Sequence, residues 1–186
     1  MSKNLPKDLY EAESMIYKTL MNYLITPNIN RFMSIQLKFE GLRLDPIVYR
    51  LSNELTKNNY DNLIIYSDMG ATALAKRDMK DISESIFSFN EYLKNIESEQ
   101  KDKILLIVSP QPYDIKEFES ICTRSINNII MINGKLEDPI VGIGSVGRET
   151  RKRFSNSWLK VFSIEPLSKG ALMKRHPEPW MLYKLN

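Results

Sequence analysis

The stretch ILLIVSPQPYDIKEFE, residues 104–119, contains a complete strand, turn and helix. It begins with five apolar residues, Ile104 to Val108, a pattern typical of a strand buried on both faces of a parallel sheet. Pro110 and Pro112 end that run, and Asp114 is suited to be the N-cap of the amphipathic segment that follows. The stretch therefore predicts a buried strand whose carboxyl end leads through a tight turn into a helix.

Two other segments repeat this apolar run. NLIIYS at 62–67 and NNIIMIN at 127–133 are apolar on every side, and helix-like sequence separates each run from the next. Earlier in the chain, MSIQLKF at 33–39 alternates apolar and polar residues, which indicates a strand with one face partly exposed. We therefore predict an α/β fold with a Rossmann-like, mostly parallel sheet flanked by helices. Residues 86 and 87 fit either a short strand or an irregular link.

Two helices in the first third of the chain are predicted from spacing and capping residues. Apolar residues recur at three- and four-residue steps between Pro6 and Ile25, with Pro6 suited to the first helical turn. In DPIVYRLSNELTKNN, Asp45 is suited to be the N-cap and Pro46 to be the first helical residue. Both helices have one apolar face with which to cover the sheet.

Beyond Asn133 the chain consists of strand-like runs separated by turn residues. The runs are SWLKVFSIEPL, GALMKRH and WMLYKLN, and no segment of helix length lies between them. They predict a C-terminal antiparallel strand meander over about residues 157–186. Because no linker or long repeat interrupts the chain, we predict a single α/β domain over residues 1–186 in which the meander shares the core.

Composition limits the classes of function. The chain has 26 Lys and Arg against 23 Asp and Glu, a net charge of +3 that is too balanced to indicate nucleic-acid binding. The single Cys122 and the single His176 do not suit a zinc cluster or a Cys/His nucleophile, so we predict no metal and no cofactor. No apolar run approaches the ~18 residues of a membrane span, and the N-terminus does not resemble a signal or transit peptide. These features predict a soluble, cytoplasmic protein.

The carboxyl edge of the predicted sheet is where a ligand would bind, since free backbone N–H groups and helix N-termini point there. Three turns fall at this edge, at 40–41, 67–72 and 109–114. The candidate ligand-binding residues in these turns are Asp68, Gly70, Pro112 and Tyr113. Each also has a purely structural interpretation, because Asp is a good cap, Gly and Pro form turns, and Tyr can pack over a sheet edge. The catalytic residues, if any, stay unknown.

A Gly-rich segment provides the other candidate site. GIGSVG at 142–147 matches the G-x-G-x-x-G phosphate-binding pattern, but GKLEDP separates it from the preceding strand, which does not suit a dinucleotide site. The segment fits an anion site, a solvated helix face or a docking surface for an acidic protein. The candidate residues are Gly142, Gly144, Arg148 and Arg151.

Four stretches together carry a resemblance to a known family: SDMGATALAKRDM, IVSPQPYDIKEFE, DPIVGIGSVGRETRKRF and IEPLSKGALMKRHPEPWMLY. From Pro6 to Tyr183 the chain resembles a family of domains of unknown function from cyanobacteria and plastids that includes the low-photosystem-II-accumulation proteins. Met79 departs from the family pattern, where an aromatic residue is expected, and so does the charged link at 94–103. The positions that match are Gly70, Pro112, Tyr113, Gly142, Gly144, Arg148, Arg151, Phe154, Pro166, Gly170, Ala171 and Trp180.

The resemblance implies a small protein of oxygenic phototrophs that takes part in photosynthesis. It carries over no catalytic residues. We therefore expect a non-enzymatic accessory factor that assembles or maintains photosystem II by binding a protein partner, a photosystem or thylakoid component. Its place would be the cytoplasm or the periphery of the thylakoid surface, without a membrane span. The alternative is a small α/β enzyme or sensor that binds a phosphorylated ligand or nucleotide at the Gly-rich turn and the carboxyl edge of the sheet.

Overall fold

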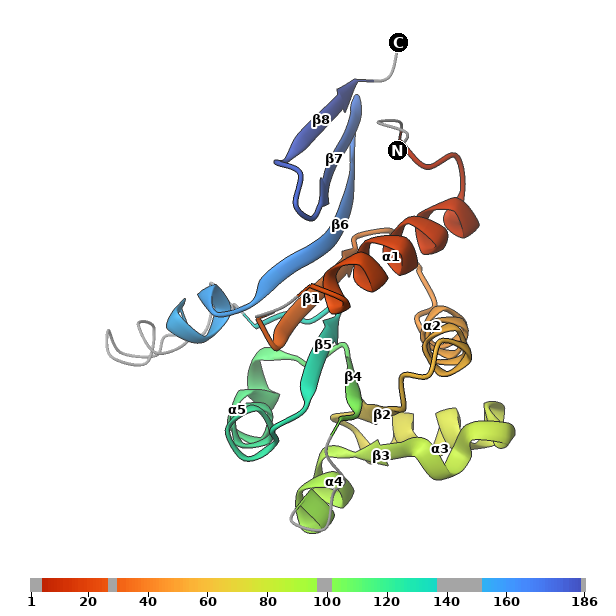
Figure 1. Ribbon diagram of the computed structural model, residues 1–186, viewed down its shortest axis with the longest axis vertical. Helices are drawn as coiled ribbons and strands as arrows, with labels where there is room; N and C mark the ends of the chain where they lie inside the picture. Colours follow the sequence, from red (N-terminus) through yellow and green to blue (C-terminus); the bar gives the residue numbers. More distant parts are fainter. Residues whose placement is uncertain (1–4, 27–29, 97–101, 137–151, 185–186) are drawn as a thin grey trace.

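The computed structural model describes residues 5–26, 30–96, 102–136 and 152–184 (Figure 1). Within these ranges, eight strands form one sheet, in which β1 to β6 pair in parallel and β7 and β8 are added through antiparallel pairs. The sheet confirms the predicted α/β class with a mostly parallel sheet. The elements in chain order are α1 (Leu9–Leu24), β1 (Phe32–Leu37), α2 (Asp45–Lys57), β2 (Asn62–Tyr66), α3 (Met69–Asp78), η1 (Lys80–Ser85), β3 (Ile86–Ser88), α4 (Phe89–Asn95), β4 (Ile104–Val108), η3 (Pro112–Asp114), α5 (Ile115–Arg124), β5 (Asn128–Ile132), β6 (Leu159–Leu167), β7 (Gly170–Arg175) and β8 (Met181–Lys184).

The three apolar runs of the sequence form β2, β4 and β5, which lie side by side in the strand order β3-β2-β4-β5-β1-β6-β7-β8. Their register aligns Leu63 with Leu105 and Leu105 with Ile129. Every residue of β4 is buried, because side chains alternate between two faces that are both covered. Since the three strands are parallel, their carboxyl ends meet at one edge of the sheet.

Helices cover both faces of the sheet (Figure 1). Helices α1, α2 and α3 pack in one core cluster with the β2 and β4 side chains Ile64 and Leu106, which defines the α1–α3 face. Helices α4 and α5 pack in a second cluster with Ile65, Leu105 and Ile107, which defines the α4–α5 face. None of the helices in the described ranges combines the length and the apolar content that crossing a membrane requires.

Strands β1 and β5 are neighbours in the sheet, but the segments that follow them lie on opposite faces of it. Helix α2 follows β1 on the α1–α3 face, whereas Phe154 and Trp158, the aromatic residues that precede β6, pack on the α4–α5 face. Such a reversal in an open parallel sheet separates the connections and leaves a crevice at the carboxyl ends of the two strands. Ligands commonly bind at this point in doubly wound folds.

Residues 86 and 87 belong to a short strand, β3, which pairs with β2 and forms one edge of the sheet. The other edge is the C-terminal meander. Strand β6 pairs in parallel with β1, and β7 and β8 follow through antiparallel pairs. The predicted antiparallel strands are confirmed, and the structure adds that they belong to the same sheet. Phe162 and Met173 anchor it in the core on the α1–α3 face.

Three details of helix initiation differ from the prediction. Helix α1 begins at Leu9 and not near Pro6, because the carboxylate of Asp8 accepts a hydrogen bond from the Glu11 N–H and acts as the N-cap. Asp45 is not the N-cap of α2: it is the first helical residue, and its carboxylate accepts from the Tyr66 hydroxyl. Asp114 precedes α5 without a side-chain cap, since its carboxylate accepts from the backbone N–H of Gln111.

Candidate functional site

Two of the three predicted turns line one recess at the carboxyl edge. This edge recess of 420 Å³ includes Asp68 after β2 and Tyr113 after β4, together with Asp45 from the start of α2. A neighbouring recess of 400 Å³ includes Glu40 from the third turn and Ser109 after β4. The edge thus brings the three turns close together, as parallel strands require.

Asp68 and Gly70 act together at the start of α3. Asp68 is the N-cap, and its Oδ1 accepts a hydrogen bond of 2.7 Å from the Ala71 N–H. A Cβ at position 70 would lie 3.0 Å from that same Oδ1. A glycine therefore leaves the cap undisturbed, and both residues have a structural role in the folded chain.

Pro112 and Tyr113 lie in η3, the single turn between β4 and α5. The Gln111 side chain folds back and donates to the Ser109 carbonyl at 2.8 Å, and the Gln111 N–H donates to Asp114 at 2.8 Å. These bonds fix the turn without any contribution from Tyr113, whose side chain is 81% exposed on the rim of the edge recess. Tyr113 is the predicted residue best placed to meet a ligand.

The floor of the edge recess holds a polar pair, Tyr66 and Asp45. The Tyr66 hydroxyl donates to Asp45 Oδ1 at 2.8 Å. Burial of Tyr66 and the negative charge of Asp45 both raise the pKa of the phenol above its ordinary value. The pair therefore stays a neutral phenol bound to a carboxylate, which ties β2 to the start of α2.

Asn133 joins the carboxyl ends of β1 and β5 at the crevice between them. Its Oδ1 accepts from the Leu37 N–H at 2.6 Å and its Nδ2 donates to the Leu37 carbonyl at 2.8 Å. The Asn133 backbone has a φ of 50°, in the left-handed region that asparagine tolerates better than most residues. The side chain thus continues the hydrogen-bond ladder of the sheet by one residue.

A larger polar pocket of 610 Å³ lies over β1 and the start of β6 on the α4–α5 face. We call it the donor pocket, because its described lining contains three lysines and no carboxylate. Sequence reasoning did not select these residues, although the alternation of MSIQLKF already placed Ser34, Gln36 and Lys38 on one face of a strand. Its lining consists of Ser34, Gln36, Lys38, Met131, Gly134, Lys135, Leu136, Ser155, Asn156, Trp158 and Lys160.

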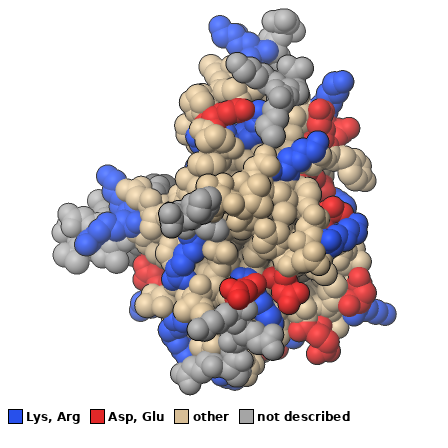
Figure 2. All heavy atoms as spheres, in the orientation of Figure 1, with Lys and Arg blue, Asp and Glu red and all other residues tan. Residues whose placement is uncertain are grey.

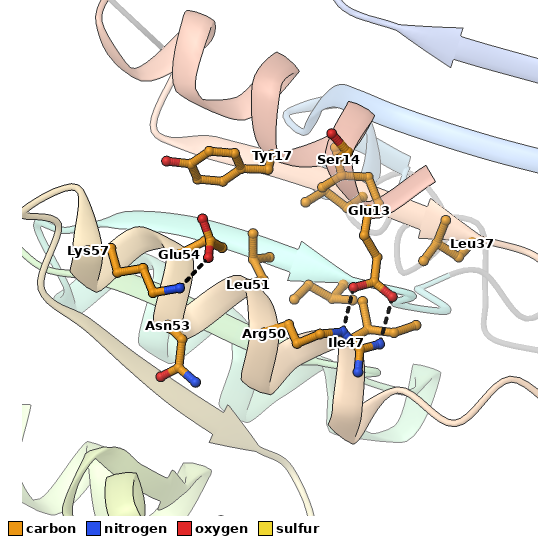
Figure 3. A pocket seen from close by; sticks show the side chains of 13 residues that line it. Glu13, Ser14, Tyr17, Leu37, Ile47, Arg50, Leu51, Asn53, Glu54 and Lys57 are labelled. Carbon is orange, nitrogen blue, oxygen red and sulfur yellow. Dashed lines mark hydrogen bonds and ion pairs between the residues drawn. The ribbon is translucent and has the colours of Figure 1, made fainter. Parts of the chain in front are cut away.

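A cavity of 430 Å³ lies between α1 and α2, over the α1–α3 face of the sheet (Figure 3). Its inner wall is apolar, formed by residues such as Ile35, Leu37 and Leu51. At its mouth the Arg50 guanidinium faces the Glu13 carboxylate from the opposite helix and donates two hydrogen bonds of 2.7 Å each (Figure 3). The ion pair bridges the two helices across the opening.

The single cysteine and the single histidine lie on opposite faces of the sheet. Cys122 is buried in the α4–α5 cluster, and burial raises the pKa of its thiol to about 12. His176 packs edge-on against Tyr23, which belongs to the α1–α3 cluster. Burial, with a smaller contribution from Lys174, lowers the pKa of His176. Among the residues that the structure describes, no three His, Cys, Asp or Glu side chains are grouped as a metal site would require.

The predicted phosphate-binding residues Gly142, Gly144, Arg148 and Arg151 lie outside the described residues.

Over the face shown in Figure 2, Lys and Arg side chains lie interspersed with Asp and Glu.

Comparison with known proteins identifies the family. The model of a domain of unknown function, DUF1995, matches residues 6–186. The chain belongs to the DUF1995 family. A search of curated proteins found no match. The DUF1995 match covers every element from α1 to β8, so the edge recess and the donor pocket both lie within the family domain.

Proposed function

We propose that this DUF1995 protein is a non-enzymatic accessory factor of oxygenic phototrophs that assembles or maintains photosystem II by binding a protein partner. The sequence resemblance to the low-photosystem-II-accumulation proteins supports the biological setting. The proposal places the protein in the cytoplasm, with peripheral contact at the thylakoid surface where its partner lies.

The observation that carries the binding role is an apolar strip on the meander. In register, Leu172 of β7 lies opposite Leu182 of β8, so both side chains project from the same face of the sheet. We call Leu167, Leu172, Trp180 and Leu182 the meander strip. Three of these side chains are strongly exposed for apolar residues: Leu167 is 43% exposed, Trp180 46% and Leu182 62%. Exposed apolar groups that gather on one surface are typical of protein interaction sites.

The strand beside this strip is the last in the sheet. β8 is terminal in the strand order, so its outer backbone edge faces away from β7. An edge strand offers N–H and C=O groups to an incoming strand, and its Met-Leu-Tyr-Lys sequence contains only one charge to oppose such pairing. In Figure 1 the β7–β8 hairpin projects beyond the helices that cover the rest of the sheet. A partner chain can reach both the edge and the strip.

A capture experiment with matched variants tests the proposal. Leu182→Lys places a charge in the strip, and Ile126→Lys places one at an apolar residue of similar exposure, 64%, in the loop before β5. We expect the tagged wild-type protein and Ile126→Lys to recover photosystem II or thylakoid components from a phototroph extract, and Leu182→Lys to lose them. Both variants should melt close to the wild-type temperature, since surface changes usually alter stability by ~0.5 kcal/mol or less.

Two outcomes would contradict the proposal. In the first, the wild-type protein recovers no photosystem or thylakoid component. In the second, Leu182→Lys recovers the same components as Ile126→Lys, which would separate the partner from the meander.

A further inference from the structure

The donor pocket contains groups that the fold itself does not use. Met33, Ile35 and Leu37 of β1 lie in the core cluster of the α1–α3 face. Because successive side chains of a strand point to opposite faces, Ser34 and Gln36 project from the α4–α5 face. Their side-chain hydrogen bonds are long: 3.4 Å from Ser34 Oγ to the Leu159 carbonyl and 3.4 Å from Gln36 Nε2 to the Gly134 carbonyl. Polar groups on a central strand are costly unless something satisfies them better than this.

Two further lining groups have no hydrogen-bond partner. The Trp158 side chain belongs to a residue only 8% exposed, and neither its indole Nε1 nor the Ser155 hydroxyl has a partner within the described chain. An indole N–H can only donate, so the missing partner must be an acceptor. Buried polar groups without partners are rare in native proteins, and a ligand is one of the few explanations for them.

Aromatic packing holds the Trp158 ring in place. Its ring lies 5.2 Å from Phe32, 5.2 Å from Phe118 and 5.8 Å from Phe154, centroid to centroid. The indole cannot turn easily to seek another partner, because these rings surround it on the α4–α5 face. The unsatisfied donor is therefore a fixed feature of the folded protein.

Positive charge converges on the same pocket from three segments. Lys38 follows β1, Lys135 follows β5 and Lys160 lies in β6 opposite Ser34. Lys38 binds Glu165 at 2.8 Å, but both side chains are partly exposed, so this ion pair is weak and can exchange for a stronger acceptor. The Lys160 ammonium lies 5.1 Å from the centroid of the Trp180 ring, a cation–π contact that holds it at the pocket.

The position of the pocket agrees with its chemistry. It adjoins the crevice between β1 and β5, where the chain leaves the two strands on opposite faces and where doubly wound folds hold their ligands. Its volume of 610 Å³ lies within the range of small-molecule sites and exceeds what a bare phosphate ion needs. From these observations we infer that the donor pocket binds the phosphate group of a phosphorylated small molecule. The pocket adjoins the meander strip where Lys160 contacts Trp180, but the inference does not depend on the proposed protein partner.

In the bound state the lysine ammonium groups surround the phosphate oxygens. The Trp158 N–H, the Ser155 hydroxyl and the Gln36 amide supply neutral donors, while the remaining volume holds the organic part of the molecule. Charge-assisted hydrogen bonds of this kind are about twice as strong as neutral ones, so the lysines should dominate affinity.

The two tryptophans of the chain provide a direct readout. In Trp180→Phe, Trp158 is the only indole, and phenylalanine keeps an aromatic ring beside Lys160. At constant ionic strength, titration with inorganic phosphate, ribose 5-phosphate and AMP should move the Trp158 indole N–H resonance and raise the melting temperature. At least one organic phosphate should bind more tightly than inorganic phosphate.

Lysine variants test whether the pocket is responsible. Lys135→Gln, which changes an exposed side chain, should weaken binding roughly tenfold, because one charge-assisted hydrogen bond is lost. The matched control Lys116→Gln removes an exposed lysine from α5 and should bind like wild type. The inference is overturned if none of the three probes moves the indole resonance or if Lys116→Gln weakens binding as much as Lys135→Gln. Equal affinity for inorganic and organic phosphates would overturn the assignment to an organic ligand.

Discussion

The edge recess and the donor pocket lie on the same sheet, yet they differ in how their polar atoms are satisfied. In the edge recess, Asp68 caps a helix, Asp45 accepts from Tyr66, and Gln111 closes its own turn. In the donor pocket, Trp158 Nε1 and Ser155 Oγ have no partner among the described residues. The polar side chains at the strand ends therefore stabilise the fold, whereas those over β1 are available for a ligand.

This contrast shows why position alone is a weak guide to function. The carboxyl edge of a parallel sheet attracts ligands because backbone N–H groups point there, but the same groups must be satisfied before any ligand arrives. Aspartates at strand ends are well suited to that task. A pocket becomes a stronger candidate when its donors exceed the acceptors that the protein itself supplies.

Asn133 lies at the crevice between the two regions, and its replacement should have the largest effect. Asn133→Gly keeps the left-handed backbone available but leaves the Leu37 N–H and carbonyl without their side-chain partners, for a loss of about 2 kcal/mol in the free energy of unfolding. Asn133→Ala adds the cost of a left-handed backbone and should lose about 3 kcal/mol. Urea denaturation measures both. A loss below about 0.5 kcal/mol in the glycine variant would mean that water replaces the side chain and that the two strands do not depend on it.

Tyr66→Phe breaks the polar pair at the floor of the edge recess. Loss of the hydrogen bond to Asp45 should lower the free energy of unfolding by about 1.5 kcal/mol at pH 7. The raised pKa of Tyr66 sets the pH dependence: the unfolded chain ionises near the ordinary value of 10.0 while the folded chain keeps its proton. The contribution of Tyr66 is therefore complete below pH 10 and declines as the pH rises above it.

The measurement is urea denaturation of both proteins at several pH values from neutral into the alkaline range. The difference in stability between wild type and Tyr66→Phe should shrink above pH 10. A difference that stays constant there would show that burial does not keep the phenol protonated.

The sequence predicts the strands of this fold well because their signal is local. Ile104–Val108 is apolar at every position, which leaves a strand covered on both faces as the simplest solution. The capping predictions differ from the structure for another reason: Asp45 is not the N-cap of α2, and Asp114 occupies the N-cap position of α5 without a side-chain cap. Each carboxylate had a competing donor nearby, the Tyr66 hydroxyl or the Gln111 N–H, and only the folded geometry shows which donor is bound.

The donor pocket could not be predicted from local sequence patterns. Lys38, Lys135 and Lys160 are far apart in the chain and meet only because β1 lies between β5 and β6. Local patterns do not determine the order of the strands, so they could not bring these residues together. The alternation of Ser34 and Gln36 was the one usable signal, since a polar row on a strand of a covered sheet calls for an explanation.

Asp68 gives the smallest effect and the sharpest test of the comparison, because it was predicted as a ligand-binding residue and is found as a cap. Asp68→Ala should lower the free energy of unfolding by about 1 kcal/mol, and Asp68→Ser, which keeps a capping oxygen, should restore most of that loss. Neither variant should change the phosphate response of Trp158, since Asp68 does not line the donor pocket. Thermal or urea unfolding and the indole resonance measure the two properties separately. If Asp68→Ser restored stability but abolished the phosphate response, the carboxylate would act on the ligand, and the division between a structural edge and a binding pocket would be wrong.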